Sequence, residues 1–120
     1  MTNKELIRKL YAEDGLRNKE FLSSLLDENF LLHWDSSDGF YQMNKQAILD
    51  LADELKFNYK YSDIEISSIV EEENQVAVHY IHKVSTPENP TEMILLAKFM
   101  VFWQFQDSKI LKGYQISKLG

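Results

Sequence analysis

The sequence contains no cysteine in its 120 residues, and it has little proline or glycine. Without cysteine there can be no disulfide framework, thiol nucleophile or thiolate metal site. The two prolines both fall in Pro87-Glu-Asn-Pro90, and because proline cannot donate to a sheet ladder, this stretch is predicted to be a loop. The four glycines stand alone at positions 15, 39, 113 and 120, so a glycine-rich phosphate loop is excluded.

Positive charge is also scarce, with 13 Lys and Arg against 19 Asp and Glu and a net charge of −6. Nucleic-acid binding rests on clustered basic residues, so no nucleic-acid partner is expected. The longest apolar run, residues 93–105, is interrupted by Lys98 and Gln104 and is too short to span a bilayer. The first residues lack the apolar core of a signal peptide. We therefore expect a cytoplasmic protein with no membrane partner.

Hydrophobic residues make up 44% of the chain and aromatic residues 12%, which is typical of a globular protein. The length suits a single domain, residues 1–120, with one real core. The aromatic residues are numerous enough to line a cavity as well as to fill that core.

The stretch 93–105 alternates like a strand, and one of its faces is wholly apolar. That face carries Met93, Leu95, Ala97, Phe99, Val101, Trp103 and Phe105. Asp107-Ser108 suits a tight turn, after which the chain is predicted to fold back. Folding back about this turn places Ile110 beside Phe105, Tyr114 beside Val101 and Ile116 beside Phe99. Its apolar face has to be covered by another layer.

Helices that could cover this face precede it in the chain. Thr2 and Glu5 form a capping box, and Gly15 is predicted to end the first helix in the left-handed conformation. Asn18 caps a second helix, and Asn44 caps a third that runs from Lys45 to about Lys56.

The remaining segments read as strands. Phe30–Asp35 is predicted to be a short strand, with Leu31, His33 and Asp35 on one face. Residues 61–71 and 75–86 follow as two longer strands joined by a turn at Glu72-Glu73-Asn74. The order is therefore helix, helix, short strand, helix and four antiparallel strands, an α+β arrangement.

This order, with the Leu16–Asp35 passage and the Phe105–Ile110 turn, resembles the nuclear transport factor 2-like superfamily, in particular its SnoaL-like and ketosteroid isomerase-like branch. The resemblance covers about residues 4–117, although members usually have glycine where this chain has Ser108. It implies a strongly curved antiparallel sheet wrapped like a cone around N-terminal helices. A pocket for a hydrophobic small molecule would open at the wide end. Because this fold hosts many activities, the resemblance does not define a reaction.

By this resemblance, Asp35 occupies the position of the general base and Tyr11 that of a phenol in the oxyanion hole. The alternatives are a turn residue that accepts from the Ser37 and Asp38 amides, and a core tyrosine. The second oxyanion donor of the isomerases is replaced by Val101, which argues against steroid isomerisation.

His33 shares a strand face with Asp35, and such a pair suits acid–base chemistry of the dehydratase type. His79 and His82 are three residues apart on a strand and therefore on opposite faces, where they cannot chelate one ion. No metal or other cofactor is expected.

The predicted pocket lining comprises Trp34, Phe99, Val101, Trp103 and Tyr114, although an aromatic stripe can equally be packed core. On the opposite face of the long strand, Met100 and Phe102 are predicted to form a homodimer interface, as the resemblance implies. The alternative is that the molecule's own side chains cover them.

Three functions remain open at this point. The first is an acid–base enzyme of the isomerase, dehydratase or cyclase type acting on a hydrophobic small molecule. The second is a non-catalytic module that binds such a ligand or a partner protein. The third is a dimerising scaffold whose cone is filled by its own aromatic residues.

Overall fold

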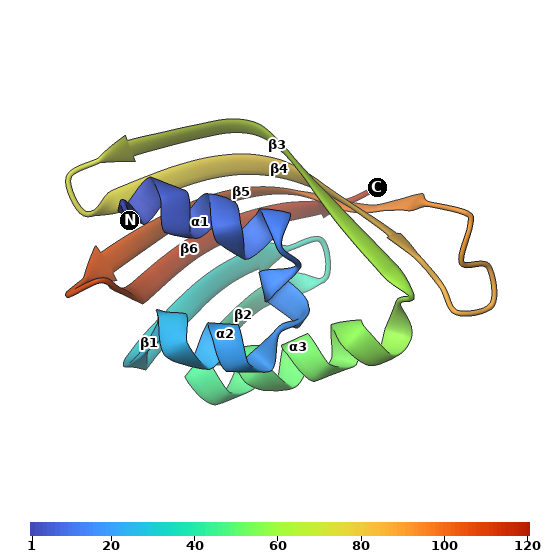
Figure 1. The fold of residues 1–120 in the computed structure, drawn as a ribbon, viewed down its shortest axis with the longest axis horizontal. Coiled ribbons are helices and arrows are strands. Elements are labelled where there is room, and N and C mark those ends of the chain that lie inside the picture. Colours follow the sequence, from blue (N-terminus) through green and yellow to red (C-terminus); the bar gives the residue numbers. More distant parts are fainter.

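A computed structural model describes all residues 1–120. The elements follow one another as α1 (Asn3–Ala12), a 3₁₀ turn η1 (Gly15–Arg17), α2 (Lys19–Leu25), β1 (Leu26–Ser36), β2 (Gly39–Asn44), α3 (Lys45–Asn58), β3 (Tyr61–Glu72), β4 (Gln75–Ser85), β5 (Ile94–Gln106) and β6 (Lys109–Leu119). Figure 1 shows a curved sheet with the helices on one side of it. The predicted α+β fold, a curved sheet around N-terminal helices, is confirmed.

The helices begin at the predicted caps. The side chains of Thr2, Asn18 and Asn44 accept hydrogen bonds from backbone amides at the starts of α1, α2 and α3. The prediction for Gly15 is wrong, because the left-handed residue after α1 is Asp14, with φ of 57°. Gly15 is required for a different reason: a Cβ there would lie 2.6 Å from the carbonyl oxygen of Leu10.

The six strands form one sheet in the order β2-β1-β6-β5-β4-β3. Two features differ from the prediction. The chain forms the additional strand β2 after the turn at Ser36–Gly39, and β1 runs parallel to β6, so the sheet is mixed rather than antiparallel throughout. The parallel pair arises because the chain crosses from the β2 edge to β3 through α3, and the C-terminal strand then fills the place beside β1.

Strand β5 buries the face that its alternation predicts, from Ala97 to Phe105. Before Ala97 the alternation changes, because the pairing with β4 contains an irregularity between His82 and Lys83. The extra residue is Leu96, and its side chain lines the interior. Met93, expected on the buried face, is exposed.

The β5–β6 hairpin turns at Asp107 and Ser108 as predicted, and both have positive φ. Phe105 pairs with Ile110, also as predicted, but a bulge then leaves Leu111 without a partner. The residues beyond the bulge are consequently shifted by one position. Val101 pairs with Gln115 instead of Tyr114, and Phe99 with Ser117 instead of Ile116.

Residues from every helix and strand except β2 and β3 contribute fully buried side chains to one hydrophobic core. Helix α1 packs against β3 and β4, whereas α3 packs against β1 and β2. Both helices therefore lie in the concavity of the sheet, as the apolar face of β5 predicts (Figure 1). None of the helices has the length and hydrophobicity needed to cross a membrane.

Candidate functional site

A cavity of about 130 Å³ lies between the helices and the concave face of the sheet. Of its 17 lining residues, 15 are hydrophobic, and the two others are His82 and Gln115. The hydrophobic wall comprises Leu10, Leu16, Leu22, Leu26, Phe30, Leu32, Trp34, Ile48, Leu51, Leu55, Tyr80, Leu96, Phe99, Trp103 and Ile110. The cone is therefore not completely filled by its own aromatic residues.

A second, wider hollow of about 410 Å³ adjoins the cavity and shares Trp34, Leu51, Leu96 and Phe99 with it. Its remaining lining is more polar and includes serines and the carboxylates of Asp38 and Glu54. The two adjoining spaces therefore differ in polarity: the cavity is almost wholly apolar, and the hollow beside it has both apolar and polar lining residues.

The glycine of β6 makes room for one of the two lining indoles. Gly113 pairs with Trp103 across the β5–β6 ladder and with Leu32 across the β1–β6 ladder. A Cβ at Gly113 would lie 2.7 Å from the Trp103 ring and 2.8 Å from the Leu32 side chain. Glycine therefore lets the Trp103 ring lie against the sheet backbone.

Three aromatic side chains pack together near the cavity, and two of them share a hydrogen bond. The indole nitrogen of Trp103 donates to the Tyr11 hydroxyl at 2.9 Å. Tyr11 packs on Tyr80 with ring centroids 4.4 Å apart. Burial raises the pKa of both phenols above their ordinary values, so both stay protonated at neutral pH.

His82 is the only residue of the cavity wall whose side chain can carry a positive charge. Its side chain is almost completely buried, and Nε2 lies 2.7 Å from the Ser62 hydroxyl on the neighbouring strand. Burial lowers the pKa of His82 to about 4, an effect opposed by Asp14 and Asp63 and reinforced by Arg17. At neutral pH the imidazole is therefore uncharged.

Gln115 is only 7% exposed and lines the cavity from β6, between Val101 on β5 and Trp34 on β1. Its side-chain amide makes no hydrogen bond within the protein, although the neighbouring Trp34 indole donates to Ser117 at 2.8 Å. The Gln115 amide is therefore free to bond with whatever occupies the chamber, whereas most buried polar side chains already have a partner.

Asp35 and His33 do not lie in the cavity. On β1 the buried positions are Phe30 and Leu32, followed by Trp34 in the cavity wall, so His33 and Asp35 alternate onto the opposite face. Asp35 is exposed, and its carboxylate accepts no hydrogen bond from the Ser37 or Asp38 amide. The expectation that this pair points into the pocket is therefore wrong.

The other predicted residues occupy different environments. Trp34, Phe99 and Trp103 line the cavity, whereas Val101 is fully buried in the core beside it. Tyr11 is a core side chain with its hydroxyl enclosed, not a group that reaches the chamber. Tyr114 lies on the outer face because of the β6 bulge, so its predicted place in the lining is wrong.

Two residues of the wall were missed by sequence reasoning, His82 and Gln115. The inward direction of His82 is visible in the sequence, because it continues the alternation of Val76, Val78 and Tyr80. For Gln115 there is no such signal, since only the bulge places it inside. No three His, Asp or Glu side chains come together in a way that could hold a metal ion.

The sequence matches no family model and no curated protein. The structure is similar to solved structures at low sequence identity. One is a protein from Jannaschia sp. CCS1 described as a SnoaL-like polyketide cyclase, with a TM-score of 0.71 and 9% identity over 94% of this chain and 83% of that one.

A second is a protein with a ketosteroid isomerase-like fold from Catenulispora acidiphila, with a TM-score of 0.73 and 12% identity over 95% of this chain and 85% of that one. A third is an NTF2-like protein of unknown function from Burkholderia pseudomallei, with a TM-score of 0.67 and 14% identity over 96% and 90% of the two chains. The chain thus has the nuclear transport factor 2-like fold, in the form that SnoaL-like and ketosteroid isomerase-like proteins share. The fold predicted from the sequence is confirmed.

Proposed function

We propose that this protein binds a small hydrophobic molecule in the cavity between α1–α3 and the sheet. The observation that carries the proposal is the chamber itself, with its almost wholly apolar wall. A dry apolar cavity of about 150 Å³ in another protein binds benzene, so a chamber of this size suits a single ring. A larger ligand would extend past the wall of Trp34, Leu51 and Phe99 into the adjoining hollow.

Toluene is a suitable probe, because both tryptophans of the chain line the cavity. We expect toluene to shift the two indole N–H signals in a ¹H–¹⁵N spectrum, with a Kd on the order of 1 mM or tighter for so few atoms. Leu51→Phe adds a ring to the wall and should weaken binding. Leu31→Phe makes the same change outside the cavity and should not. If toluene near saturation moves neither indole signal, the proposal fails.

Acid–base catalysis is a second candidate function, and the cavity position of His82 favours it. A neutral imidazole fixed by Ser62 could remove a proton α to a bound carbonyl. The low pKa of His82 weighs against this role, because a general base works best when its pKa is near the operating pH. Binding is therefore the first proposal and catalysis the second.

Hydrogen–deuterium exchange tests the catalytic candidate without knowledge of the substrate. With cyclohexanone in D₂O, the protein should accelerate deuteration of the α-carbons, and His82→Gln should abolish the acceleration. Asp35→Asn should leave it unchanged, since Asp35 is exposed on the other face of β1. Loss of exchange in Asp35→Asn but not in His82→Gln would restore Asp35 as the base and reject His82.

A further inference from the structure

The polar side chains that reach the interior differ in one respect, which is whether they already have a partner. The Trp103 indole is bonded to Tyr11, the Trp34 indole to Ser117, and the His82 imidazole to Ser62. Tyr80 packs on Tyr11, with ring centroids 4.4 Å apart. Gln115 alone presents an amide to the cavity with neither its N–H₂ nor its C=O engaged.

The free N–H₂ and C=O of the Gln115 side chain determine which ligand groups can bind beside it. A primary amide offers a donor and an acceptor side by side, so one ligand edge carrying an acceptor and a donor can bind both at once. The Gln115 amide makes no hydrogen bond to the protein, and such a ligand would supply a partner for both its donor and its acceptor. A purely apolar ligand would leave the amide unsatisfied.

The cavity wall has no charged side chain, and this limits the charge that a bound ligand can carry. The lining contains no Lys, Arg, Asp or Glu, and His82 is uncharged at neutral pH. An ion transferred into this chamber would lose its hydration and meet no counter-charge. The group that meets Gln115 is therefore neutral.

Building on the function proposed above, we infer that Gln115 determines ligand specificity, and that the ligand is a neutral, compact, mainly apolar ring carrying an adjacent hydrogen-bond donor and acceptor, as in a lactam. The apolar part of the ring fills the space among the leucines and Phe99. The donor–acceptor edge pairs with the Gln115 amide.

Three probes with seven non-hydrogen atoms separate this inference from the function on which it rests. 2-Piperidone carries the donor and the acceptor, cyclohexanone carries only the acceptor, and toluene carries neither. Gln115→Leu keeps a side chain of similar size but removes both polar groups. We expect Gln115→Leu to weaken binding of 2-piperidone by about tenfold or more, to weaken cyclohexanone by less, and to leave toluene equal or tighter.

Suppose that toluene binds both the wild type and Gln115→Leu. If the variant then loses equal affinity for 2-piperidone and cyclohexanone, or loses none, the role of Gln115 is overturned and the proposed function stays intact. Absence of toluene binding to the wild type would overturn both. A second measurement does not depend on the variant. In the wild type, 2-piperidone should shift the side-chain N–H₂ signals of Gln115 more than toluene does, and equal small shifts would contradict the inference.

Discussion

Replacing Phe102 with Glu is expected to convert a homodimer of this protein into monomers. We propose that the outer face of the sheet forms the dimer interface. Met100 and Phe102 on β5 are 54% and 52% exposed there. The β6 bulge adds Tyr114 and Ile116 beside them, paired with Phe102 and Met100 respectively.

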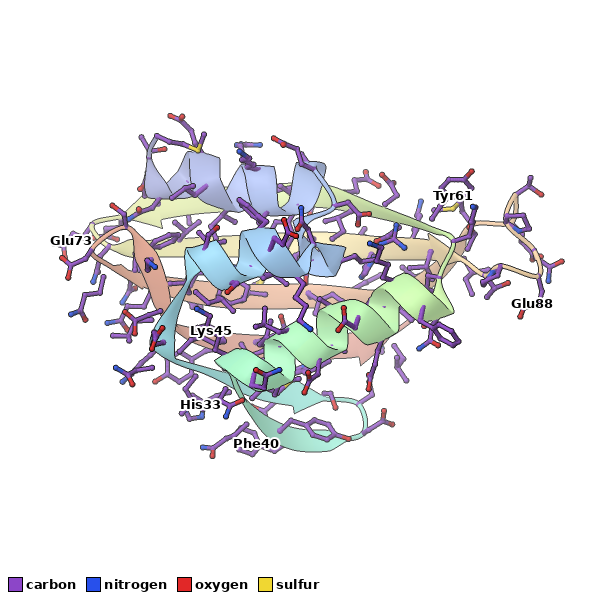
Figure 2. All side chains as sticks on the ribbon, turned by 60° about the horizontal axis from the view of Figure 1, so that its bottom comes forward. His33, Phe40, Lys45, Tyr61, Glu73 and Glu88 are labelled. Carbon is purple, nitrogen blue, oxygen red and sulfur yellow. The ribbon has the colours of Figure 1, made fainter.

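The apolar surface continues onto β1 and β2. The His33 ring stacks on Tyr114, with centroids 5.1 Å apart, and lies near Phe40 at 6.1 Å. Figure 2 shows His33 and Phe40 together at the β1–β2 edge of the molecule. The outer face therefore presents one contiguous apolar and aromatic patch across four strands. Large exposed patches of this kind mark interaction surfaces, and aromatic residues and Met are enriched in them.

Light scattering or sedimentation at about 50 μM, within the working range of ordinary homodimers, measures the outcome. Phe102→Glu places a charge in the middle of the patch, where a second copy could not solvate it. Phe57→Glu is the matched control, because Phe57 is exposed on α3, far from this face in the sequence and on the helical side. A wild-type protein that is already monomeric at this concentration would contradict the dimer.

The second large effect concerns pH and His82. The stability of the fold should decrease as the pH falls from about 6.5 to about 4. In this window the unfolded chain protonates His82, with its ordinary pKa of 6.5, whereas the native chain keeps the ring neutral, with a pKa of about 4. The stabilising contribution is complete above pH 6.5 and lost as the pH reaches 4. Its size is about 3 kcal/mol, from a difference of 2.5 pH units.

Urea unfolding between pH 4.5 and 7.5 measures this dependence. The wild type should lose up to about 1.4 kcal/mol per pH unit more than His82→Gln, which has no proton to bind at this position. NMR titration of the native His82 ring provides an independent measurement. A midpoint near 6.5, together with equal pH slopes for the two proteins, would show that the ring is accessible to water and that the cavity wall is not dry.

Much of the architecture follows from local sequence signals. The caps at Thr2, Asn18 and Asn44 and the turn at Asp107 are determined by short-range chemistry, and the structure has each of them. The strand β2 is different, because Phe40 and Tyr41 gain their strand geometry only from pairing with β1. The parallel pairing of β1 with β6 joins segments about 80 residues apart, and no local pattern encodes it.

The candidate site was less predictable for a related reason. The side chains of a strand alternate, so the identity of the inward residues depends on strand register. Asp35 was predicted to point into the cavity because of its position at the end of the strand, after Trp34. Trp34 is the residue that points inward, so Asp35 lies on the other face. Sequence reasoning identified the indoles and Phe99 of the wall, but His82 and Gln115 were missed. Whether the wall encloses a space also depends on packing among several elements, which no single segment specifies.

The single unpaired residue Leu111 has a consequence for how this protein could change. If Leu111 instead paired with Gln104, an uninterrupted hairpin would turn Lys112, Tyr114 and Ile116 inward and expose Gly113 and Gln115. Deleting Leu111 would not do this, because Lys112 would still pair with Gln104. The bulge itself therefore sets both the polar chemistry of the interior and the apolar surface of the exterior. Ligand choice and self-association are in this sense coupled through one register, although they occupy opposite faces of the sheet. Libraries intended to alter only the ligand should vary Gln115 and keep the register of β6 as it is.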